Sequence, residues 1–235
     1  MMKKVMAFAI ALLACHAMQA QYFCSTSGTV LHYVNYDEAG QSTWNETATV
    51  TNVSKKGSEL KAQYVAKIVN NKAKNNTSYT LVNWSYDGTN TVCDEDLMYG
   101  VYIASDSDPA KYNDSYRQAL MEDRKFKGSN QFTLTNSASG GKAMPDRSYQ
   151  LLVGMLKNEV NISGAAYMGN EEVKTTAGSF QCLKVSYLKR TKVVLKTNTL
   201  RVTEWYAKGI GLVKSEAYDT KGKLDSRILL VKIGK

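Results

Sequence analysis

The stretch "TEWYAKGIGLVKSE", from Thr203 to Glu216, decides how the rest of the chain is interpreted. Its Gly-x-Gly and two lysines suggest a phosphate-binding loop, but such a loop needs Gly-Lys-Ser/Thr and a following helix, and neither is present. The residues after the glycines alternate as in a strand, so the sequence predicts a hairpin with its turn at Lys208-Gly209. Trp205 falls on the opposite face from Tyr206, and we expect it in the core or in the wall of a cavity.

The same alternation of residue types continues along most of the chain. It is clear from Val30 to Tyr36 and again from Leu60 to Ile68. Short turns separate consecutive runs, which favours an antiparallel meander. Several runs carry apolar or aromatic residues on both faces, as in a strongly curved sheet that folds around its contents. The sequence therefore predicts a mainly β fold, a single curved antiparallel sheet in the form of a half-barrel or open barrel.

Two turns follow one plan, Tyr-Asp-x-x-Gly, at Tyr36–Gly40 and again at Tyr218–Gly222. In such a turn the aspartate accepts hydrogen bonds from turn amides and the glycine takes a positive φ. The likeness reflects either an internal repeat or one turn solution that is used twice.

One segment departs from the strand pattern. Asp108 and Pro109 form a helix start signal, and Tyr112 and Tyr116 lie one helical turn apart. The spacing predicts one helix over about 109–124, packed against or inside the sheet.

The N-terminus has the layout of a secretory signal peptide. "MMKK" is basic, an apolar run follows from Val5 to Ala14, and Ala20 precedes Gln21. We expect residues 1–20 to be the signal peptide and residues 21–235 to form a single β-rich domain, located in the periplasm or cell envelope. No later stretch approaches the ~20 apolar residues of a membrane-spanning helix.

An alternative interpretation of the same region is a bacterial lipobox. "LLAC", from Leu12 to Cys15, ends the apolar run on a cysteine. Lipidation at Cys15 would make the protein an outer-membrane lipoprotein, and it is the one route by which we expect contact with a membrane.

Three cysteines follow the predicted cleavage site, namely Cys24, Cys93 and Cys182. An exported chain favours one disulfide among them with one thiol left over, and the sequence does not fix the pairing. No Cys-x-x-Cys is present, which argues against a thioredoxin-type site and a cysteine-rich zinc site.

The rest of the composition argues against several chemistries. The chain has two histidines, His16 in the leader and His32 within a strand, so histidine-based catalysis and histidine-rich zinc sites find no support. The carboxylates of Asp94–Asp96 and Glu171–Glu172 are adjacent residues rather than pairs across a cleft. The net charge of +9 comes without a nucleic-acid-reading motif. We therefore expect no catalytic residue, no metal, no cofactor and no nucleic acid.

A family resemblance rests on "TTAGSFQCLKVSY" (175–187), on residues 203–224, on "GTVLHYVNYDEAGQ" (28–41) and on the three cysteine positions. These resemble an exported, uncharacterised β-rich family of Bacteroides-type bacteria, a domain of unknown function. The family is distantly similar to the half-barrel of periplasmic lipoprotein carriers, which implies an apolar ligand cavity and transfers no catalytic residue.

The leading functional hypothesis is an extracytoplasmic binding module that holds a lipid or other amphiphile inside the curved sheet. The cavity would be lined by aromatic residues of the strands and of the predicted helix, namely Tyr33, Tyr64, Trp84, Tyr112, Tyr116 and Trp205. The alternatives are a structural or interaction protein that binds another envelope protein, and a carboxylate-based hydrolase of glycans.

Overall fold

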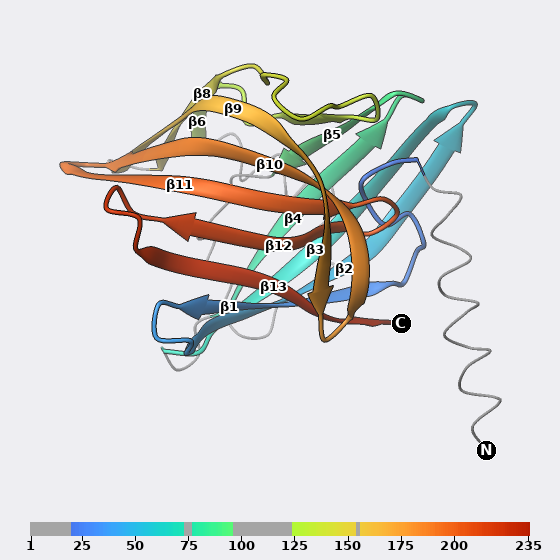
Figure 1. Ribbon diagram of the computed structural model, residues 1–235, viewed down its shortest axis with the longest axis horizontal. Helices are drawn as coiled ribbons and strands as arrows, with labels where there is room; N and C mark the ends of the chain where they lie inside the picture. The colour runs from blue at the N-terminus through green and yellow to red at the C-terminus, as the bar shows by residue number, and fades with distance from the viewer. Residues whose placement is uncertain (1–19, 73–76, 96–123, 154–155) are drawn as a thin grey trace.

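The computed structural model describes residues 20–72, 77–95, 124–153 and 156–235, which form one antiparallel sheet (Figure 1). The strands are β1 (Val30–Asp37), β2 (Ser42–Lys56), β3 (Glu59–Asn70), β4 (Thr77–Tyr86), β5 (Asn90–Glu95), β6 (Arg124–Gly128), β7 (Phe132–Thr135), β8 (Arg147–Val153), β9 (Leu156–Thr175), β10 (Gly178–Val193), β11 (Lys196–Ala207), β12 (Gly211–Tyr218) and β13 (Leu224–Gly234).

The strand order is β6-β8-β9-β10-β11-β12-β13-β1-β2-β3-β4-β5-β7, and most neighbours in the sheet are neighbours in sequence. This is the predicted meander. The pairing of β13 with β1 joins the C-terminal half of the chain to the N-terminal half. The predicted single curved antiparallel sheet is therefore confirmed.

The two edges of the sheet are strands that follow each other in the chain. β6 and β7 are separated by residues 129–131 and occupy opposite ends of the strand order. A three-residue link cannot span a flat sheet of this width, so the sheet must curl until its edges approach each other. On β9, the Tyr167 hydroxyl donates to the Thr133 carbonyl of β7 at 3.1 Å, which ties the two sides together. β6 and β7 do not pair, so the sheet stays open.

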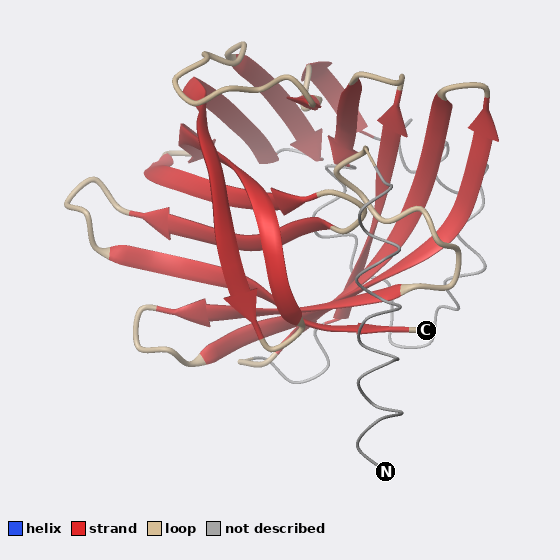
Figure 2. Ribbon diagram, turned by 45° about the vertical axis from the view of Figure 1, so that its right-hand side comes forward, coloured by secondary structure: helices blue, strands red, loops and turns tan. Residues whose placement is uncertain are grey.

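The interior lies between the two halves of the curled sheet, β1 to β5 and β8 to β13, which incline toward each other in Figure 2. Alternate residues of each strand point inward, as Leu183, Val185 and Tyr187 do on β10. The largest side chains that are less than 2% exposed include Phe23, Leu31, Leu134, Leu183 and Leu230, contributed by both halves and by the segment before β1.

The two Tyr-Asp-x-x-Gly turns have the same structure. Asp37 accepts from the amides of residues 39 and 41, and Asp219 accepts from the amides of residues 221 and 223. Gly40 and Gly222 follow with φ of 74° and 81°. The shared sequence thus encodes one turn geometry at two hairpins.

The predicted helix at 109–124 lies outside the described residues, except for Arg124, which begins β6. No described residue lies in a helix, and accordingly none belongs to a helix that could cross a membrane. Residues 1–19, including Cys15, also lie outside the described ranges.

Candidate functional site

Three of the predicted cavity residues come together in the interior, but they contact other parts of the chain. Trp84 stacks on Phe23 with ring centroids 5.8 Å apart, and the Tyr64 hydroxyl donates to the Cys24 carbonyl at 2.6 Å. The Tyr33 hydroxyl donates to the Leu212 carbonyl at 3.1 Å. Burial raises the pKa of Tyr33 and Tyr64 well above the usual value, so both hydroxyls stay protonated as donors.

The segment Gln21–Cys24 occupies the space next to these aromatic residues. Phe23 is fully buried, and the Tyr22 amide donates to the Thr91 hydroxyl at 3.0 Å. The Gln21 carbonyl accepts from the Gly209 amide at 2.8 Å, so the turn that the sequence predicted at Lys208-Gly209 holds this segment in place. Tyr64 and Trp84 are therefore part of a filled core, and the space that a ligand would take beside them holds Phe23.

Trp205 is buried, as expected, but it lies apart from the other candidates. Its cross-strand neighbours Lys184 and Lys214 share its face, with their ammonium groups 5.1 and 4.4 Å from the ring centroid. Tyr206 points to the opposite face, where its ring lies 5.2 Å from that of Phe132. The strand thus places Trp205 on the side away from the interior, packed under two lysines.

A buried carboxylate lies on the same face as Trp205. Glu216 is 8% exposed and receives hydrogen bonds from Lys214 at 3.0 Å, from Arg227 at 2.9 Å and from the Tyr218 hydroxyl at 2.9 Å. Burial acts to raise the pKa of Glu216, but these hydrogen bonds outweigh burial and hold the pKa below its usual value. A carboxylate bound by two cations is a poor general base, so this cluster favours a structural role.

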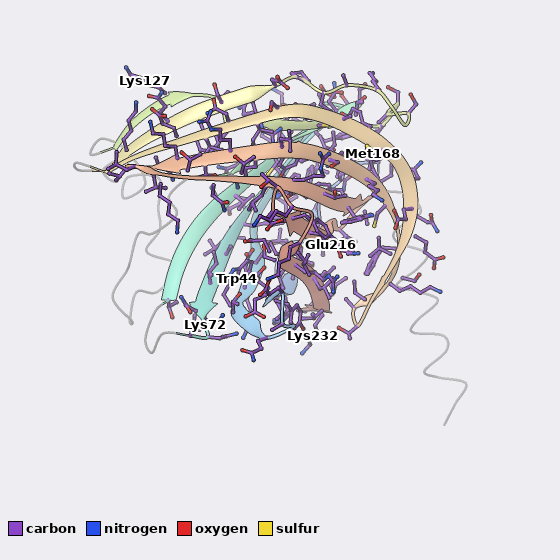
Figure 3. All side chains as sticks on the ribbon, turned by 60° about the vertical axis from the view of Figure 1, so that its left-hand side comes forward. Trp44, Lys72, Lys127, Met168, Glu216 and Lys232 are labelled. Atoms are coloured by element: carbon purple, nitrogen blue, oxygen red, sulfur yellow. The ribbon has the colours of Figure 1, made fainter. Side chains whose placement is uncertain are left out.

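An arch of β9 and β10 passes over the ends of β11 to β13, and Figure 3 shows Glu216 beneath it, with Met168 on the arch. The turn of this arch reaches β13, where the Thr176 hydroxyl donates to the Val231 carbonyl at 2.7 Å. Sequence reasoning did not single out the Glu216 cluster. Its signal is the two-residue spacing of Lys214, Glu216 and Tyr218, which places them on one face of a strand.

A polar hollow of about 310 Å³ lies near the β6 edge, at the Lys127 end of Figure 3. It is lined by Lys127, Gly128, Ser148, Tyr149, Gln150, Glu159 and Asn161. Gly128 is required there because its φ is 94° and a Cβ would lie 2.2 Å from the Ser148 carbonyl oxygen. The lining offers an ammonium, a carboxylate, amides and hydroxyls, which suits a polar ligand rather than an amphiphile.

The three cysteines are buried, and no disulfide joins any two of them in the structure. Cys93 on β5 lies across the strand pair from Trp84, whereas Cys182 on β10 faces Ala207 in the other half of the sheet. Burial raises the pKa of Cys182 to about 12, with a smaller contribution from the charge of Glu171. Cys182 is therefore an unreactive thiol.

The remaining predicted residues, Tyr112 and Tyr116, lie outside the described ranges, so the structure does not test their place in a cavity. Within the ranges that the structure does describe, no three metal-binding side chains gather into a site.

Comparison with known proteins agrees with this architecture. A family profile described as DUF3108-like matches residues 26–230. The chain belongs to the DUF3108-like family. No curated protein matches this member of the family.

Two solved structures share the fold of this DUF3108-like chain. One, described as an exported protein with a YmcC-like fold from Bacteroides fragilis, has a TM-score of 0.67 at 21% identity. The other, described as a lipoprotein from Parabacteroides distasonis, has a TM-score of 0.69 at 20% identity. In both cases the alignment covers 91% of this chain and 98% of the other. At this identity the likeness establishes the fold, and the resemblance to an exported, uncharacterised β-rich family of Bacteroides-type bacteria is confirmed.

Proposed function

We propose that the protein is an interaction module of the cell envelope, a curved β scaffold that binds its partner on its surface rather than in an apolar interior. The observation that carries this proposal is the position of Phe23. It is fully buried and stacked on Trp84, in the place that an amphiphile would take between the two halves of the sheet.

The location rests on the N-terminus and on the neighbours. The basic and apolar segments before Ala20 are typical of an exported chain. The two structural neighbours are described as an exported protein and a lipoprotein. A shared fold alone does not transfer a function, so the surface role is argued from this chain's own core.

A second candidate function is amphiphile binding inside the sheet, with Gln21–Cys24 displaced by the ligand. It is favoured by the aromatic side chains of Tyr33, Tyr64 and Trp84, which meet in one part of the interior. Displacement would break the hydrogen bonds of Gly209 to Gln21 and of Tyr64 to Cys24 and would expose Phe23, which makes it the costlier arrangement.

Titration with N-phenyl-1-naphthylamine, a dye that fluoresces in apolar cavities, distinguishes the two. We expect no saturable binding to the parent protein and a gain of binding in Phe23→Ala, because this substitution empties a dry cavity next to Trp84. The matched control is Phe180→Ala on β10, which is only partly buried and removes the same side chain outside that space. Saturable binding of one dye per parent molecule would overturn the proposal in favour of the second candidate.

A further inference from the structure

The hairpin between β10 and β11 ends in an apolar tip. Val193 pairs with Lys196, so Val194 and Leu195 alone form the two-residue turn. Val193, Val194 and Leu195 are 43%, 53% and 93% exposed, and among the described residues no other large apolar side chain is as exposed as Leu195. In Figure 1 the hairpin projects at the left-hand end of the molecule. Three consecutive apolar side chains at a projecting tip call for a partner that covers them.

The backbone of this turn is strained at Val194, because a β-branched residue rarely adopts a positive φ. Val194 has a φ of 55°, and within the described residues it is the single non-glycine residue with a positive φ. Two-residue hairpin turns with positive φ favour glycine, asparagine or aspartate, and a β-branched residue there is an outlier. Folding alone would favour glycine at this position, as the β2–β3 turn has at Gly57. The apolar side chain is kept in spite of the strain, which points to a role outside the fold.

Cations surround the tip. The segment 189–196 reads "KRTKVVLK", with Lys189, Arg190, Lys192 and Lys196 and no acidic residue. Val194 donates its amide to the Lys157 carbonyl, which places one more lysine beside the turn. The nearby acidic residue Glu159 pairs with Lys157, whose hydrogen bond lowers the pKa of Glu159, and Lys192 and Arg190 add to this. The end of the hairpin is therefore strongly positive around an apolar centre.

From this juxtaposition we propose that the β10–β11 tip is a membrane-contact site. Val193, Val194 and Leu195 insert into the interfacial region of a bilayer that contains anionic lipids, and the four cations of 189–196 bind the headgroup phosphates. This names the partner of the proposed interaction module and rests on that proposal. It adds a second route to a membrane beside the expected lipidation of Cys15.

The chemistry favours a lipid surface over a protein. A stable protein interface needs about 20–30 residues on each side, and three apolar residues on a two-residue turn fall far short of that. A bilayer needs only a few apolar side chains at the acyl boundary together with basic residues, which an anionic surface attracts.

The test is a fluorescent reporter beside the tip in the full chain. Thr197→Cys is labelled with an environment-sensitive dye, since Cys24, Cys93 and Cys182 are buried, and the parent chain carried through the same labelling gives the background. The control reporter is the same dye at Ser58→Cys, on the β2–β3 turn, which has Lys55 and Lys56 but no apolar tip. Vesicles are of phosphatidylcholine alone or of phosphatidylcholine mixed with phosphatidylglycerol.

We expect a blue shift of the dye at position 197 with the phosphatidylglycerol vesicles. We expect no shift with phosphatidylcholine alone, and none at position 58.

Val194→Gly combined with Leu195→Asn should abolish the shift while the protein stays folded, because glycine and asparagine suit the turn. Lys192→Gln combined with Lys196→Gln should weaken vesicle binding at least about tenfold and reduce its salt dependence. Lys55→Gln combined with Lys56→Gln should leave it unchanged.

Any one of three results would overturn the proposal. These are no shift at position 197, an equal shift at position 58, or a shift that survives Val194→Gly with Leu195→Asn. So would a shift that grows with protein concentration without vesicles, which would assign the tip to a second copy of the chain. The naphthylamine titration of the interior is independent of these readings, so failure of the surface-binding proposal and failure of the membrane tip can be told apart.

Discussion

Strand β11 ends in two turns that use opposite chemistry. At its C-terminal end the turn of residues 208–210 is buried around Gly209, which has a φ of 71° and donates its amide to Gln21. At its N-terminal end Val194 takes a φ of 55° in an exposed turn with no such contact to the core. Where the fold sets the requirement, glycine supplies the geometry. Where a bulky side chain keeps the same kind of geometry in solvent, the reason lies outside the fold.

The two ends of β11 should differ most in how much removal of a side chain lowers the free energy of unfolding, and Trp205 should show the largest loss. It is 3% exposed between two lysines, so Trp205→Ala should lower the free energy of unfolding by about 3–5 kcal/mol, the range for a buried aromatic residue. Thr197→Ala at the exposed end should change it by less than about 0.5 kcal/mol. Urea unfolding of both variants measures this, and equal effects would show that the two ends do not differ in packing.

The next effect concerns the buried charge beside Trp205. Glu216→Gln should lower the free energy of unfolding at neutral pH by about 1–3 kcal/mol, because it weakens charge-assisted hydrogen bonds from Lys214 and Arg227. The folded-state pKa of Glu216 is depressed, so its contribution is present above the unfolded pKa and is lost as the pH falls through the folded pKa. The variant and the parent should therefore converge in stability at acidic pH. A difference in stability between variant and parent that stays constant from neutral to acidic pH would show that the charge of Glu216 does not contribute to stability.

Gly209→Ala tests the buried turn directly. A Cβ at a positive φ should cost about 1–2 kcal/mol of folding stability. The same strain should loosen the bond to Gln21, which hydrogen exchange at the Gly209 position reports as faster exchange. Unchanged stability and exchange would mean that this turn does not hold the N-terminal segment.

Val194→Gly should have a small effect on folding stability, with the sign opposite to that of Gly209→Ala. Relief of the left-handed strain exceeds the added entropy of glycine in the unfolded chain, so we expect a gain of about 0.5 kcal/mol. Thermal unfolding of the two glycine-site variants side by side gives the comparison. A loss of stability in Val194→Gly would remove the argument that valine is kept there for another purpose.

Much of the fold could be predicted from local pattern. Alternation gave the strands, and the glycines placed the β11–β12 turn, because strand periodicity and positive φ are local properties. Alternation also put Trp205 on the face opposite Tyr206, but that is the face under Lys184 and Lys214, away from the interior. The edge positions of β6 and β7 could not be predicted, since they depend on how far the sheet curls and on contacts such as Tyr167 to Thr133, between residues distant in sequence. A disulfide pairing could not be predicted for a similar reason, because the compartment says nothing about which cysteines meet in space.

The candidate site was harder to predict than the fold. Tyr33, Tyr64 and Trp84, which the sequence offered as cavity residues, are buried, but aromatic residues around a cavity and aromatic residues in a core have the same pattern. What fills the interior is Phe23, within "QYFCS", a stretch with no strand periodicity to mark it. The exposed tip at Val194 was equally hidden, because "TKVVLKT" is indistinguishable in sequence from the middle of a strand.

The central claim is that the interior of the curved sheet is filled by the chain itself and that binding takes place on the surface. Native mass spectrometry of the protein purified from its own host tests this most directly. The account predicts a mass equal to the polypeptide with any covalent N-terminal group, unchanged by collisional activation. A heavier species that releases a non-covalently bound amphiphile on activation would contradict it.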